Sequence, residues 1–118
     1  MIAYKVLRKH NSKLYSAVIL NSKYTIEYKK NRWIKPKIGK IFCFAALEDA
    51  ERFIVDTDEV WEVKIEIENP IKVNYILDTY QITDTEITMF WQKNIDGTHR
   101  LPEGTILADK IKLLRRVV

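Results

Sequence analysis

Residues 37–68, which read KIGKIFCFAALEDAERFIVDTDEVWEVKIEIE, decide the fold because they predict a strand, a helix and a second strand in succession. Residues 41–44 are apolar on both faces, as expected for a central strand. Residues 47–54 place apolar side chains along one helical stripe and begin with an acidic turn, which suits a helix N-terminus. Residues 59–68 alternate apolar and charged side chains, which indicates a strand with one buried and one exposed face.

The remaining segments predict more strands and a second helix. Further strands are expected at residues 4–9, 14–20, 24–28, 71–76, 105–108 and 111–118. Residues 84–93 predict a short helix, although their β-branched and aromatic side chains leave a strand as the alternative. The predicted fold class is α+β, with about six to seven mostly antiparallel strands and short helices at about residues 46–55 and 84–93.

Length and composition are those of one globular unit. The 118 residues predict a single domain over residues 1–118, and hydrophobic residues make up 47% of the sequence. No apolar run reaches the roughly 18 residues of a membrane span, and the start lacks the apolar region of a signal peptide. With one cysteine and no membrane partner expected, the predicted location is the reducing cytoplasm.

The net charge of +4 hides a strong asymmetry along the chain. Residues 1–46 hold eleven basic residues and one acid, whereas residues 47–68 hold nine acids and two basic residues. One explanation is that basic and acidic surface elements lie side by side and neutralise each other. The other is a basic face that binds an anionic ligand.

Residues 29–40 are the most suggestive binding segment, because six cations surround Trp33 without any acid. Asn31, Pro36 and Gly39 favour a loop between strands. Such a loop can hold phosphates while its aromatic side chain stacks on a base. The alternative is that Trp33 packs over the edge of the core while the lysines lie in water.

A second group, at residues 90–100, combines aromatic, amide and guanidinium side chains, which is one trait of a nucleotide pocket. The alternative is that Phe90 and Trp91 belong to the core. The candidate ligand-binding residues from the two segments are Tyr28, Lys30, Arg32, Trp33, Lys35, Phe90, Trp91, Asn94 and Arg100.

No motif predicts catalysis, a metal site or a cofactor. The two histidines, His10 and His99, lie in predicted turns far apart in sequence. Cys43 lies in a predicted core strand, where burial would make its thiol a poor nucleophile. The acids at residues 56–62 fit no EF-hand loop and are expected in a helix-to-strand turn.

Several stretches resemble small accessory proteins that are encoded by phages and prophages of low-GC bacteria. They are LYSA at residues 14–17, GKIFCF at 39–44, ALEDAERF at 46–53, EVWE at 59–62 and PEGTILAD at 102–109. Among such proteins are anti-defence sponges of the anti-Thoeris type, which sequester cyclic ADP-ribose-type signals without cleaving them. The resemblance implies a mobile-element protein that acts in the host cytoplasm, and it assigns no ligand residue.

The first functional hypothesis is a non-catalytic protein that sequesters a small anionic nucleotide, with a pocket completed by homo-oligomerisation. Nucleic-acid binding and protein-based inhibition of a host defence complex remain alternatives. The strand–helix–strand unit is also similar to ADP-ribosyltransferase cores. The arginine or histidine, serine or tyrosine, and glutamate of that family have no matched positions here, so an enzyme of this kind comes last.

Overall fold

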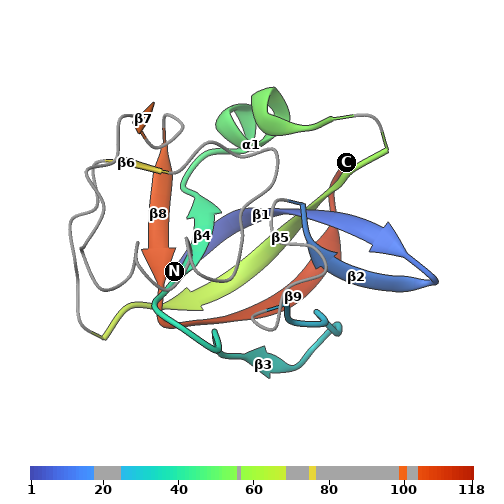
Figure 1. Cartoon of the computed structure of the whole chain (residues 1–118), viewed down its shortest axis with the longest axis horizontal. Helices are drawn as coiled ribbons and strands as arrows, with labels where there is room; N and C mark the ends of the chain where they lie inside the picture. Colours follow the sequence, from blue (N-terminus) through green and yellow to red (C-terminus); the bar gives the residue numbers. More distant parts are fainter. Residues whose placement is uncertain (18–24, 56, 69–74, 77–98, 101–103) are drawn as a thin grey trace.

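The computed structural model describes residues 1–17, 25–55, 57–68, 75–76, 99–100 and 104–118 (Figure 1). Its elements are β1 (Ile2–His10), β2 (Lys13–Ser16), β3 (Trp33–Ile34), β4 (Ile41–Phe44), α1 (Leu47–Phe53), β5 (Glu59–Glu66), β6 (Tyr75–Ile76), β7 (His99–Arg100), β8 (Thr105–Ala108) and β9 (Lys110–Arg116). Seven strands form an antiparallel sheet in the order β3-β9-β5-β1-β4-β8, with β2 paired to β1. Strands β6 and β7 form a separate pair.

The sheet bends because β8 and β9 are two halves of one strand that turns at Asp109. The first half pairs with β4 and the second with β5. At the bend, the Asp109 carboxylate accepts hydrogen bonds from the Lys40 ammonium and from the backbone N–H of Glu68. The Asp109 N–H in turn donates to the carbonyl of Glu66 at 2.9 Å. One carboxylate at the corner therefore fastens β9, the end of β5 and the start of β4 together.

Side chains alternate between two cores because successive strand residues point to opposite faces. The larger core lies on one face of the sheet and includes Ala3, Leu7, Cys43, Val63, Ile65, Ile111 and Leu113. On the other face, α1 packs Ala50 against Val6, Phe44 and Val60, and the rings of Phe44 and Phe53 lie 5.4 Å apart. Among the described elements, α1 covers one end of the sheet only, as Figure 1 shows.

The predicted helix near residues 46–55 is confirmed as α1, and the central strand is confirmed as β4, which lies between β1 and β8. The described part of the chain is mostly antiparallel β-sheet, as predicted, with one short helix. The predicted helix at residues 84–93 lies outside the described residues. No helix among the described residues is long and apolar enough to span a membrane.

Two strand predictions need correction. Residues 25–28 are not a strand: only Tyr28 forms an isolated bridge, its N–H donating to the carbonyl of Leu14 at 2.8 Å. The strand predicted at 59–68 ends at Glu66, and its first residues, Glu59 and Val60, are both buried. Both faces of β5 are covered there, because α1 packs on one side and the larger core lies on the other.

Candidate functional site

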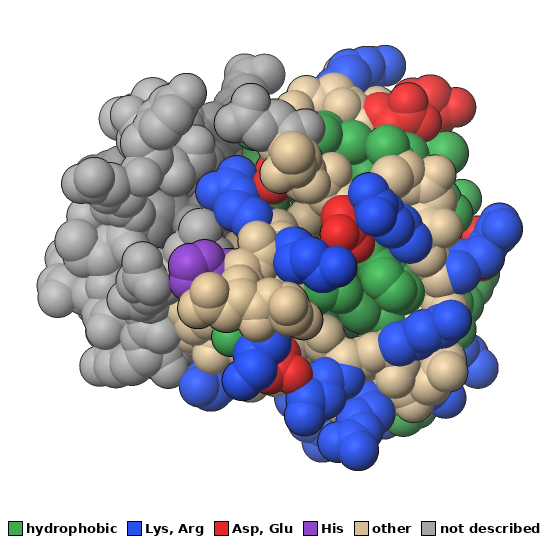
Figure 2. All heavy atoms as spheres, turned by 90° about the vertical axis from the view of Figure 1, so that its right-hand side faces the viewer, with side chains coloured by type: hydrophobic (Ala, Val, Ile, Leu, Met, Phe, Trp, Pro, Cys, Tyr) green, Lys and Arg blue, Asp and Glu red, His purple; other side chains and the backbone are tan. Residues whose placement is uncertain are grey.

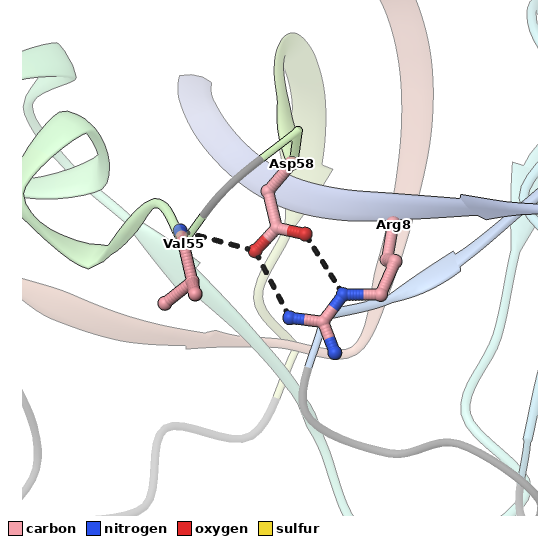
Figure 3. Close-up of polar contacts among 3 residues, drawn as sticks. All are labelled: Arg8, Val55 and Asp58. Carbon is pink, nitrogen blue, oxygen red and sulfur yellow. Dashed lines mark hydrogen bonds and ion pairs between the residues drawn. The ribbon is translucent and has the colours of Figure 1, made fainter.

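The acid that precedes β5 is used to hold the fold. The Asp58 carboxylate, 2% exposed, accepts hydrogen bonds from Nε and Nη2 of Arg8 at 2.8 and 3.2 Å (Figure 3). The same carboxylate also accepts the backbone N–H of Val55 at 3.3 Å. These contacts tie β1 to the turn between α1 and β5, so Asp58 is a structural residue.

The acids within β5 pair with cations of the neighbouring strand β9. Each ion pair joins one acid to one base: Glu59 with Arg116 at 3.6 Å, Glu62 with Arg115 at 3.3 Å, and Glu66 with Lys110 at 3.1 Å. Glu59 also accepts the indole N–H of Trp61 at 3.0 Å. The described residues contain no cluster of acids, histidines and cysteines that could hold a metal ion. Within the described part of the chain, the acids of β5 thus pair with β9, and Asp58 pairs with Arg8.

Two cations of the 29–40 segment have carboxylate partners, because Lys29 lies 3.6 Å from Glu27 and Lys40 pairs with Asp109. Lys30, Arg32 and Lys35 are exposed, and none of them has an ion pair within the described part of the chain. The segment is fastened to β9 because the N–H of Asn31, which has a φ of 63°, donates to the carbonyl of Leu113 at 3.0 Å. Figure 2 shows how Lys and Arg side chains outnumber carboxylates over the side of the molecule that carries the β1–β2 hairpin.

Trp33 lies on β3, the strand at the edge of the sheet, where alternation buries Ile34 and leaves Trp33 38% exposed. Two ammonium groups from β9 lie over its ring: Lys110 Nζ is 5.0 Å and Lys112 Nζ is 5.6 Å from the ring centroid. Trp33 is therefore partly open to solvent and flanked by cations, rather than sealed over the core. Cation–π contacts of this kind contribute about 0.5–1 kcal/mol at exposed sites.

Lys64 on β5 completes this surface. Strand register places Lys112 directly opposite Trp33 on one side and directly opposite Lys64 on the other. Lys64 is exposed, and neither Lys64 nor Lys112 has an ion pair among the described residues. Lys64, Lys110 and Lys112 were not predicted as site residues, because only the pairing of distant strands brings them beside Trp33. The available signals were the lone lysine in an acidic strand and the KIK alternation at 110–112.

Tyr28 does not lie on this surface. It is 5% exposed, and the Lys5 ammonium lies 5.8 Å from its ring centroid. Lys5 is buried as well, and its Nζ donates to the carbonyl of Phe42 at 2.7 Å. Burial lowers the pKa of Lys5, raises the pKa of Tyr28 and raises the pKa of the Cys43 thiol to about 11. A base could not stack on Tyr28 without opening the core.

The second predicted group is not placed beside the first. Phe90, Trp91 and Asn94 lie outside the described residues, and of Arg100 only the backbone, in β7, is described. Of the candidate residues, the structure brings Lys30, Arg32, Trp33 and Lys35 to one edge of the sheet and adds the lysines of β9 and β5. Comparisons with protein families, curated proteins and solved structures find no match to the chain.

Proposed function

We propose that this protein is a non-catalytic binding protein that sequesters a small anionic nucleotide on the surface around Trp33. The observation that carries the proposal is a partly exposed indole flanked by Lys110 and Lys112, on a surface where further cations have no carboxylate partner among the described residues. In the bound state, the base stacks on Trp33 and the phosphates lie against the neighbouring cations.

The chemistry of these groups favours binding over turnover. Ammonium and guanidinium groups are hydrogen-bond donors without an acceptor, and an indole N–H is also only a donor. Such a set neutralises phosphate charge and offers a stacking platform, but it supplies no general base for hydrolysis. The buried Lys5 and Cys43 are reactive residue types, yet the core encloses both. The proposed activity is therefore retention of an intact ligand.

The biological role in this proposal comes from the resemblance to phage and prophage accessory proteins. A protein that sequesters a cyclic or ADP-ribose-type nucleotide in the host cytoplasm would deprive a defence system of its signal. Tight sequestration requires a large binding free energy, about −12 kcal/mol for a nanomolar site. An assembly of several copies, each closing the site of another, would help to reach that affinity.

The test is nucleotide binding followed by recovery of the ligand. We expect ADP-ribose and cyclic nucleotides to raise the melting temperature, since ligand at a hundredfold over Kd stabilises by about 2.7 kcal/mol. After heat denaturation, chromatography should return the ligand intact. Trp33→Ala should weaken binding by about 1–3 kcal/mol, the value of one base–aromatic stack.

The matched control is Trp61→Phe, which alters a tryptophan whose indole contacts Glu59 instead of this surface. It should bind as the wild type does. Cleaved ligand would replace the proposal with an enzyme. Binding that is equal in Trp33→Ala and wild type would remove Trp33 from the site.

A further inference from the structure

Four side chains form a row across strands β3, β9, β5 and β1, on the same face of the sheet as α1. Register places Trp33 of β3 opposite Lys112 of β9, Lys112 opposite Lys64 of β5, and Lys64 opposite Ile2 of β1. Directly opposed residues point to the same face of a sheet. The row therefore reads aromatic, cation, cation, apolar, and its two ends are 38% and 45% exposed.

The two central lysines are costly for the fold. Like charges directly opposite each other on paired strands destabilise a sheet. The acids on either side of Lys64 in β5 do not relieve the repulsion, because Glu62 pairs with Arg115 and Glu66 with Lys110. Among the described residues, the contact of Lys112 with the Trp33 ring is the one interaction that offsets this repulsion. A bound phosphate, accepting hydrogen bonds from both ammonium groups, would turn repulsion into attraction.

The length of the row limits the size of the ligand that it can bind. Neighbouring strands lie about 4.8 Å apart, so three spacings separate Trp33 from Ile2 by about 14 Å. That length accommodates two nucleoside units in an extended arrangement with their phosphates in the middle. Within the described residues, no strand continues the row beyond Ile2. A mononucleotide would cover Trp33 and Lys112 and leave Lys64 without a counter-charge.

We infer that the row binds a phosphate-bridged dinucleotide. One base stacks on Trp33, the phosphates lie over Lys112 and Lys64, and the second nucleoside packs on Ile2. This inference rests on the proposed function, since it specifies the class of nucleotide that the Trp33 surface takes. It adds Lys64 and Ile2, which a site for one nucleotide does not need.

Calorimetric titration of the full chain with AMP, the linear dinucleotide pApA, cyclic di-AMP and a long oligoadenylate tests the inference. A dinucleotide is expected to bind at least about tenfold more tightly than AMP, because it gains a second phosphate contact with a charged donor. Lys64→Gln should lower dinucleotide affinity by about tenfold and leave AMP affinity within about twofold. Lys9→Gln is the matched control: it removes an exposed lysine at the far end of β1 and should change neither affinity.

The outcomes distinguish a failure of the dinucleotide inference from a failure of the proposed function. Equal affinity for AMP and the dinucleotides, with no effect of Lys64→Gln, overturns the row but leaves the Trp33 site intact. Affinity that keeps rising with oligoadenylate length and falls steeply with salt replaces the dinucleotide with single-stranded nucleic acid. No heat from any of these probes, together with no shift of the melting temperature by ADP-ribose, overturns the proposed function itself. Circular dichroism of each variant shows whether it is folded, and Lys112→Gln repeats the test from the neighbouring strand.

Discussion

Strands β5 and β9 pair along most of their length, yet two positions along this pair differ in electrostatics. At the start of β5, Glu59 and Glu62 meet Arg116 and Arg115. Nearer its end, Lys64 meets Lys112 beside the exposed ring of Trp33. The first arrangement stabilises the fold, whereas the second opposes it. In the proposed function, the charge at the second position binds a phosphate of the ligand.

The largest effect is expected just before β5. Asp58→Ala removes a carboxylate that accepts two hydrogen bonds from Arg8 and one from Val55, and it leaves the Arg8 guanidinium without that partner. We expect a loss of about 2–4 kcal/mol in the free energy of unfolding, measured by urea denaturation. Nucleotide affinity should stay unchanged at temperatures where the variant is folded.

Arg115→Ala provides the exposed counterpart, since its side chain is 69% exposed in its pair with Glu62. Exposed ion pairs contribute about 0–1 kcal/mol, so this variant should lose far less stability than Asp58→Ala. If the two variants lost the same amount, burial would not distinguish the Asp58 contact from a surface ion pair.

Lys5 differs from the exposed lysines of the row, because it also has no ion pair among the described residues but lies inside the core. Burial lowers its pKa below 10.5, so the unfolded chain binds more protons than the folded one between the lowered pKa and 10.5. Its contribution to stability therefore rises with pH through that window, by up to about 1.4 kcal/mol per pH unit.

The measurement compares wild type with Lys5→Met in denaturant titrations from neutral pH toward pH 10.5. The free energy of unfolding of wild type minus that of Lys5→Met should increase as pH rises. The raised pKa values of Cys43 and Tyr28 act with the opposite sign at high pH, but both groups are present in both proteins. A difference that stays constant would show that Lys5 is charged in the folded state over the whole range.

Local sequence patterns were sufficient to predict the central elements of the fold but insufficient to predict all residues of the site. The apolar run of β4 and the helical stripe of α1 identify themselves within a few residues, so both were predicted near their true bounds. The burial of Glu59 depends on α1 and the larger core covering opposite faces, which alternation within β5 does not encode. An added irregularity is the bulge that leaves Leu114 unpaired between Leu113 and Arg115.

The Trp33 surface could be predicted only in part, because it combines residues that are adjacent in sequence with residues from distant strands. The loop cations and Trp33 were found because they are adjacent in sequence. Lys112 and Lys64 come from strands that follow much later, and only antiparallel register aligns them with Trp33. Tyr28 was wrongly predicted as a site residue: it is adjacent in sequence to residues 29–40, yet it lies in the core. Register between distant strands is set by the whole sheet, so nearby sequence does not reveal it.

The smallest expected effect on stability comes from reversing one charge in the row. Lys64→Glu replaces a repulsive cross-strand pair with an ion pair to Lys112, and such opposite-charge pairs contribute about 0.2–1 kcal/mol. The variant should therefore be slightly more stable than wild type without ligand while binding dinucleotide more weakly, because a carboxylate now faces the phosphates.

Lys9→Glu, which reverses an exposed charge at the other end of β1, controls for net charge. Thermal unfolding with and without cyclic di-AMP measures both properties in one series. If Lys64→Glu lost stability as well as affinity, Lys64 would be part of what holds the sheet together, and the contrast between these two positions of the β5–β9 pair would fail.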